Sequence, residues 1–137
     1  MRFSNSRFLR CVLIADATTC FAIGLLMVFG FRFLAELLGL PDALLRYAGI
    51  SLFPFAIFLV YLSSRVSLST PAVWAVILLN ALWTLDSFLL FVTGWVNPTQ
   101  LGYAFVTAQA IGVAVFASLE YLGLKRSRII SSGVVTE

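Results

Sequence analysis

Histidine is absent from the chain, cysteine occurs twice, and charged side chains make up only 11% of the residues. Cys11 and Cys20 lie in one apolar run at a spacing that matches no CxxC or metal motif, so disulfide, redox and zinc roles are poorly supported. No nucleophile has an adjacent base, and no motif for catalysis or cofactor binding is present. The sequence therefore predicts a protein that is not an enzyme and that has no cofactor and no metal site.

Hydrophobic residues, by contrast, make up 61% of the chain, and the mean hydropathy is +1.04. Soluble domains have roughly 45–50% apolar and about 25% charged residues, so this composition indicates a membrane protein. The pI of about 9.2 does not indicate nucleic-acid binding, because the basic residues lie at the ends of apolar runs and form no patch. The lipid bilayer is the expected partner, and a second copy or a partner membrane protein stays open.

Four apolar runs are long enough to cross a hydrocarbon core of about 30 Å at about 1.5 Å per residue. They cover 11–31, 43–62, 71–93 and 99–124. Residues 32–39 carry apolar and charged side chains at helical spacing, which predicts an amphipathic helix on the membrane surface. The polar tail 127–137 lacks the means to pack, and we expect it to be mobile. Residues 1–137 thus form one all-α membrane domain, an antiparallel bundle of four transmembrane helices with a surface helix between the first two spans.

Local signals add detail to three of the spans. Pro54 near the middle of the second span should bend its axis and free the carbonyl of Ile50, and Ser51 could satisfy a freed carbonyl nearby. Ser69 or the next residue, followed by Pro71, predicts an N-cap for the third span. The fourth span is rich in alanine and glycine, so other helices can approach it on two sides, and we expect it to be the most enclosed helix.

The distribution of basic residues predicts the orientation. With four spans both termini lie on one side, where we find Arg2, Arg7, Arg10, Arg65, Lys125, Arg126 and Arg128. The other side has Arg32 and Arg46. By the positive-inside rule, this asymmetry places both termini in the cytoplasm.

Polar side chains within the spans are the candidate functional residues, namely Asp16, Arg46, Asn80, Trp83, Asp86, Ser87, Gln109 and Glu120. Asp16 and Glu120 share a level about 6–9 Å deep from the cytoplasmic ends of their spans. In one interpretation Asn80 satisfies Asp16, while Glu120 meets Arg10 or Arg65 at the rim. In the other, the two carboxylates face each other and share a proton, as proton-coupled carriers require.

Asp86 lies about 12 Å deep from the opposite side, near the level of Gln109. Leaving it unpaired there costs about 2.5–3.5 kcal/mol, whereas a surface pair between Asp42 and Arg46 is worth only roughly 0.2–0.5 kcal/mol. These magnitudes favour Arg46 turning inward to Asp86, with Gln109 or Ser87 completing its hydrogen bonds.

Several short segments together resemble a family of small bacterial four-helix integral membrane proteins that has no assigned activity. They are LIADA at 13–17, LGLP at 38–41, LRYAG at 45–49, NALW at 80–83, PTQLG at 98–102 and QA at 109–110. The resemblance covers nearly the whole chain and implies this fold in the bacterial inner membrane.

Two function classes remain. The sequence favours a structural or interaction subunit, because polar seams more often join helices than bind ligands. The alternative is a carrier or channel for a small solute or proton, using the membrane-embedded Asp16 and Asp86. A water-accessible cavity lined by Asp16 would favour the carrier, whereas a dry, paired Asp16 would count against it.

Overall fold

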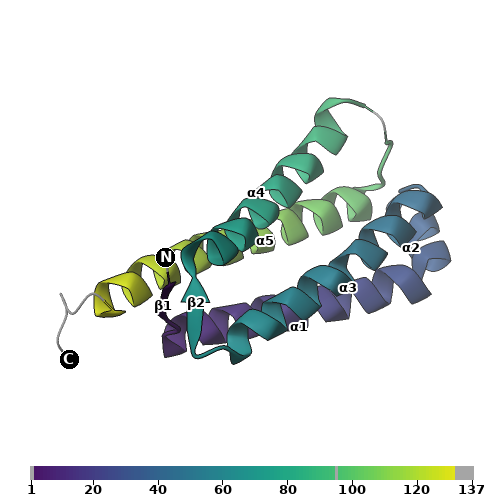
Figure 1. Cartoon of the computed structure of the whole chain (residues 1–137). Coiled ribbons are helices and arrows are strands. Elements are labelled where there is room, and N and C mark those ends of the chain that lie inside the picture. The colour runs from purple at the N-terminus through teal and green to yellow at the C-terminus, as the bar shows by residue number, and fades with distance from the viewer. Residues whose placement is uncertain (1, 95, 132–137) are drawn as a thin grey trace.

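The computed structural model describes residues 2–94 and 96–131, and these are mostly helical, with one short pair of strands (Figure 1). The elements in chain order are β1 (Arg2–Ser4), α1 (Arg7–Phe29), α2 (Phe31–Leu38), α3 (Asp42–Ser64), β2 (Ser67–Ser69), α4 (Thr70–Val92) and α5 (Gln100–Ser131). Helices α1, α3, α4 and α5 are long and apolar enough to cross a membrane. The chain is therefore a multi-pass, helical membrane protein.

The predicted spans coincide with these helices to within a few residues at most of their ends, and capping residues explain where two of them begin. The Ser6 hydroxyl accepts the Leu9 N–H at 3.2 Å, so α1 starts before its apolar run. The Ser69 hydroxyl accepts the Ala72 N–H at 3.4 Å, which confirms the predicted N-cap of α4.

The C-terminal end of α5 differs from the prediction. Residues 127–131, expected to belong to a mobile tail, continue the helix to Ser131. Basic residues interact favourably with the negative end of the helix macrodipole, and Lys125 and Arg126 lie in the last two turns of α5. The remainder of the predicted tail, 132–137, lies outside the described residues.

Pro54 lies inside α3, which continues on both sides of it. Ser51 lies about one turn before the proline, and its hydroxyl donates to the carbonyl oxygen of Ala48 at 2.7 Å. Ser51 therefore does not satisfy the carbonyl of Ile50, the group that lacks a donor because proline has no N–H.

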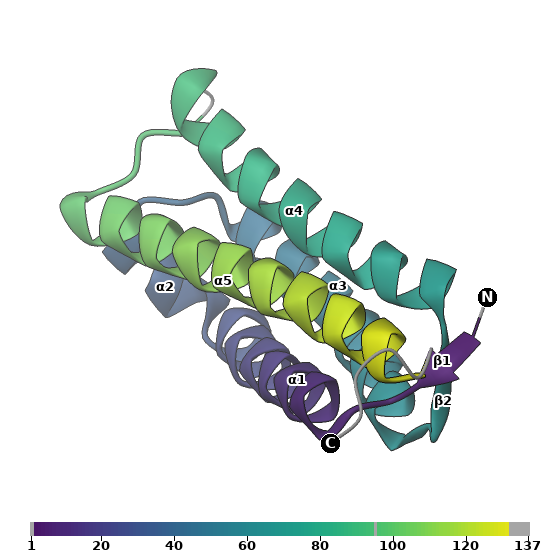
Figure 2. The ribbon, with the colours of Figure 1, turned by 90° about the vertical axis from the view of Figure 1, so that its left-hand side faces the viewer.

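The long helices pack as two pairs, α1 with α3 and α4 with α5, and the pairs meet along α1 and α5 (Figures 1 and 2). Helices α3 and α4, both described over their full length, hardly touch. The spatial order is thus α3, α1, α5, α4, with the two outer helices separated on one side. This arrangement leaves room between the pairs.

Within the first pair, two glycines allow close helix contact. A Cβ at Gly24 would lie 3.3 Å from the carbonyl oxygen of Gly49, and one at Gly49 would lie 2.9 Å from the Cβ of Met27. Small residues at such positions let backbones approach closely. Among the described spans, α1 is the most buried and α5 the least. The prediction that α5 is the most enclosed helix is therefore wrong.

One end of the molecule is joined by a ribbon that the sequence does not predict. Strand β1 pairs antiparallel with β2, with Arg2 opposite Ser69 and Ser4 opposite Ser67, and β1 also contacts α5. The Asn5 side-chain amide extends this link, because it donates to the carbonyl oxygens of Leu62 at 3.2 Å and Arg65 at 3.0 Å. The ribbon connects the start of α1 to the segment between α3 and α4.

At the opposite end, the start of α5 packs against the end of α2. The Thr99 N–H donates to the carbonyl oxygen of Leu38 at 3.0 Å, and its hydroxyl donates to that of Leu37 at 2.8 Å. Both acceptors belong to the last turn of α2, which its own backbone leaves unsatisfied. A Cβ at Gly102 would lie 2.0 Å from the Leu38 carbonyl oxygen, so this contact requires glycine. Contacts at both ends of the molecule therefore hold the two helix pairs together.

Candidate functional site

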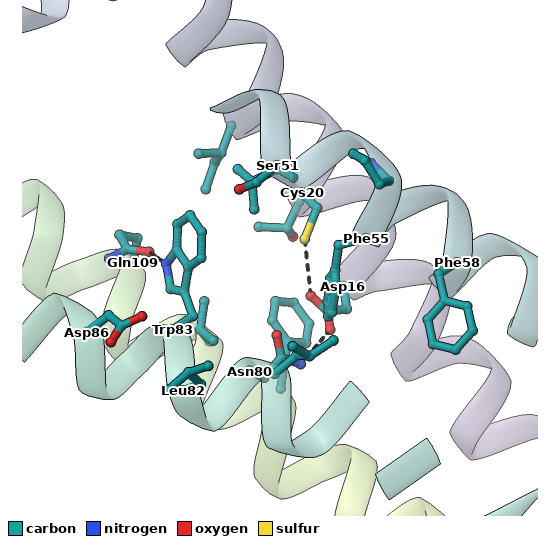
Figure 3. Close-up of a pocket in the computed structure, with 18 of the residues that line it drawn as sticks. Asp16, Cys20, Ser51, Phe55, Phe58, Asn80, Leu82, Trp83, Asp86 and Gln109 are labelled. Carbon is teal, nitrogen blue, oxygen red and sulfur yellow. Dashed lines mark hydrogen bonds between the residues drawn. The ribbon is translucent and has the colours of Figure 1, made fainter. Parts of the chain in front are cut away.

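A cavity of about 750 Å³ lies between the two helix pairs, and all four long helices line it (Figure 3). Small-molecule sites typically measure about 300–1,000 Å³, so the volume suits a drug-sized molecule. Most of its wall is apolar, with the polar or thiol groups of Asp16, Thr19, Cys20, Ser51, Asn80, Trp83, Asp86 and Gln109. The cavity is partly open.

A second hollow of about 230 Å³ adjoins the first around the same polar residues. Trp83, Asp86 and Gln109 line both, and the smaller space continues toward Leu40 and Leu44 near the start of α3. The accessible interior therefore extends along much of the length of the helices.

Asp16, Asn80 and Glu120 form one buried cluster that joins α1, α4 and α5. The Asn80 Nδ2 donates to Asp16 Oδ2 at 2.9 Å and to Glu120 Oε1 at 2.6 Å. An amide nitrogen has two hydrogens, so each carboxyl group receives one. The Cys20 thiol contacts the other oxygen of Asp16 at 3.6 Å. The predicted pairing of Asp16 with Asn80 is confirmed.

Glu120 does not lie at the rim, where the sequence placed it with Arg10 or Arg65. Its exposed fraction is 0%, and its Oε2 has no hydrogen-bond partner among the described residues. The Arg10 guanidinium donates to the backbone carbonyl of Arg65 at 3.5 Å, and the Arg65 guanidinium lies 5.5 Å from the ring centre of Tyr61. The pairing with a surface arginine is therefore wrong, because the Glu120 side chain points inward. That Asp16 and Glu120 share a proton stays a prediction.

Trp83, Ser87 and Gln109 form a second cluster, which fixes α4 against α5. The Trp83 Nε1–H donates to the side-chain oxygen of Gln109, whose amide donates in turn to the Ser87 hydroxyl at 2.9 Å. The Ser87 hydroxyl donates to the Trp83 carbonyl at 2.9 Å, which closes the ring of contacts. These polar side chains thus join α4 to α5, and they also hold the indole of Trp83 at the cavity wall.

Asp86 and Arg46 are not brought together. No ion pair between them is present among the described residues, and the Arg46 guanidinium lies 5.6 Å from the ring centre of Phe31 and 5.4 Å from that of Tyr47. Arg46 stays exposed at the start of α3, while Asp86 lines both hollows. The predicted pair is wrong, because cation–π contacts close to Arg46 hold its long side chain beside α2.

Sequence reasoning missed the aromatic part of the wall. Phe55 and Phe58 on α3 and Phe105 and Phe116 on α5 line the cavity. The spacing of each pair is close to whole helical turns, so a helical projection would group them, but it could not show that the faces meet across open space. Gly112 also lines the cavity, and a Cβ there would meet no heavy atom within 4 Å.

The described residues contain no group of three or more histidine, cysteine, aspartate or glutamate side chains suited to hold a metal ion. The arrangement therefore offers hydrogen bonding, negative charge and aromatic surface in a partly open cavity. Comparison with protein-family models, with curated proteins and with solved structures finds no match to this chain.

Proposed function

We propose that this protein binds a small solute within its membrane domain and acts as a carrier. The observation that supports the proposal is the cavity of about 750 Å³, lined from α1, α3, α4 and α5 and bordered by Asp16 and Asp86. A bundle whose only task is to support a partner gains nothing from such a space, since unfilled volume forfeits packing contacts. The cavity thus favours the carrier over the structural subunit that the sequence alone favours.

The proposal includes the placement of the chain in the membrane. The four long helices form an antiparallel bundle in a bacterial inner membrane, α2 lies on the membrane surface, and both termini are cytoplasmic. Two features support this placement. Strand β1, which precedes α1, contacts α5, so the first and last elements of the chain meet at the end of the molecule that carries the β1–β2 ribbon. The basic residues also cluster at that end. In this placement the gap between α3 and α4 faces lipid, so an apolar solute can enter from the bilayer.

The two carboxylate sites have different parts in the proposal. Asp16 is 1% exposed and hydrogen-bonded to Asn80 and Cys20, which counts against a carrier that binds its solute at Asp16. In the proposal Asp16 therefore positions the helices and does not contact the solute. Asp86 is the carboxylate available to a solute. Proton coupling through Asp16 and Glu120 remains the finer form of the proposal, since two carboxyl groups that contact one amide can hold a proton between them.

The test uses the full chain in lipid nanodiscs and N-phenyl-1-naphthylamine, a neutral apolar fluorophore, with empty nanodiscs as the partition background. We expect saturable binding to the wild type. Gly112→Leu adds a side chain where no atom lies within 4 Å of the new Cβ, and it should weaken binding by filling the cavity. Ala104→Leu, an exposed position of the same helix outside the cavity lining, is the matched control and should bind as the wild type does.

Absence of saturable binding, or equal binding by the wild type and Gly112→Leu, would refute the cavity as a solute site. The structural or interaction subunit would then be the better explanation. One observation supports that second candidate: the separation of α3 from α4 leaves a side that a second copy or a partner helix could cover. Its measurement is the oligomeric state of the detergent-solubilised chain by light scattering.

A further inference from the structure

Asp86 differs from the buried Asp16 and Glu120, because it is exposed and its carboxylate has no partner among the described residues. It forms no hydrogen bond and no ion pair with any described residue, and it lines both hollows. Asp16 and Glu120 are already held by Asn80, and Arg46 lies over Phe31 and Tyr47. A carboxylate inside a membrane domain is costly unless it pairs with a positive group or accepts hydrogen bonds from a donor.

The walls around Asp86 supply no such positive group. Neither hollow has a lysine or arginine among its lining residues, so the interior is negative at this level. With one free carboxylate, the charge that complements the site is a single positive one. Anions and multiply charged cations would leave unpaired charge in a low-dielectric space.

The aromatic side chains complement the same charge. Trp83 lies three residues before Asp86 on α4, a spacing that puts the two side chains on neighbouring parts of one helix face. The indole N–H is engaged by Gln109, which fixes the ring at the wall, and Figure 3 shows Trp83 and Asp86 at the same end of the cavity. An aromatic face attracts organic cations, and tryptophan does so most strongly. The apolar wall beyond them suits an apolar body.

We propose that the solute is a small organic monocation with an apolar body, such as a quaternary or protonated amine, which binds with its positive group beside Asp86 and Trp83. The inference rests on the proposed function and specifies its substrate class. The apolar body occupies the larger cavity, and the positive group takes the place of the absent basic residue.

The test compares two probes of the same shape. Benzyltrimethylammonium carries a positive charge, and neopentylbenzene is its neutral isostere with carbon in place of nitrogen. Each is titrated against bound N-phenyl-1-naphthylamine on the full chain in zwitterionic nanodiscs, after correction for partition into empty nanodiscs. We expect the cation to displace the fluorophore at a roughly tenfold lower concentration than the isostere.

Asp86→Asn keeps the size of the side chain and removes its charge, so the preference for the cation should fall to about two- to fivefold, the part that the Trp83 ring still supplies, while the neutral probe binds as before. Asp42→Asn, an exposed carboxylate outside both hollows, is the control and should keep the wild-type preference. Equal displacement by both probes on the wild type would refute the cationic substrate and leave the cavity site intact. An unchanged preference in Asp86→Asn would also overturn the inference. Absence of saturable fluorophore binding to the wild type would refute the proposed function itself.

Discussion

Replacing Asn80 with leucine removes the amide nitrogen to which Asp16 and Glu120 are both bonded, at 2.9 Å and 2.6 Å. All three side chains are buried, so water cannot take over these contacts without entering the bundle. With one proton shared by the two carboxyl groups, one hydrogen bond goes to a charged group and contributes about 1.5–3 kcal/mol, and the other goes to a neutral group and contributes about 0.5–1.5 kcal/mol. The loss of both predicts a destabilisation of about 2–4.5 kcal/mol. That is a large part of the roughly 5–15 kcal/mol by which a typical protein is stable.

The measurement is the free energy of unfolding in mixed micelles, followed by far-ultraviolet circular dichroism as the denaturing detergent is increased. Thr84→Ala is the control one turn further along α4, because the Thr84 hydroxyl bonds only to backbone carbonyls in the described structure, at 3.1 Å and 3.4 Å. It should cost about 0.5–1.5 kcal/mol.

A triple variant separates the hydrogen bonds from the effect of size. Asp16→Leu, Asn80→Leu and Glu120→Met together remove every polar group of the cluster, so no buried carboxyl group is left without a donor. Apolar replacement of a whole buried polar cluster is often neutral, and the triple variant should be more stable than Asn80→Leu alone. The reasoning fails if Asn80→Leu stays within about 0.5 kcal/mol of the wild type, or if the triple variant is the less stable of the two.

Three further predictions concern packing, charge and topology. Gly102→Ala should cost about 1–3 kcal/mol in thermal unfolding, because the new Cβ would lie 2.0 Å from a backbone carbonyl oxygen of α2. Gly112→Ala, with no atom within 4 Å, should match or exceed the wild type. The effects of Arg46→Leu and Asp86→Leu on stability should add to within about 0.5 kcal/mol, since the two side chains do not meet, and a larger coupling in the double-mutant cycle would contradict the structure. Reporter fusions after α5 should read as cytoplasmic and those between α2 and α3 as periplasmic, and the opposite pattern would reverse the proposed orientation.

The spans could be predicted from the sequence because membrane physics constrains them strongly. An apolar run must be long enough to cross the hydrocarbon core, and its backbone must bond within itself, so run length alone locates a helix. The pairing of Asp16 with Asn80 followed from the same arithmetic, since depth counted along two helices predicts which polar groups share a level.

Depth does not give direction around a helix axis, and this explains the wrong pairing of Glu120. Glu120 was placed at the correct level but paired with arginines at the rim, whereas its side chain points to Asn80. Arg46 could reach inward by length, yet two aromatic rings beside it offered nearer partners. The β1–β2 ribbon gave no signal, because Ser67–Ser69 resembles any polar turn. The cavity depends on how four faces fit together, which no single stretch of sequence contains.

The contacts at the two ends of the molecule have a consequence for the space between them. At one end the β1–β2 ribbon connects the helix pairs, and at the other Thr99 and Gly102 hold α5 against α2. The residues of these end contacts do not line the cavity, and they hold the pairs together in addition to the Asp16–Asn80 hydrogen bond, which joins the pairs at the cavity wall. Substitutions at apolar lining positions such as Gly112 can therefore change which molecule fits while the end contacts keep the pairs in place, whereas substitutions at Asp16 or Asn80 alter both the site and the stability of the fold.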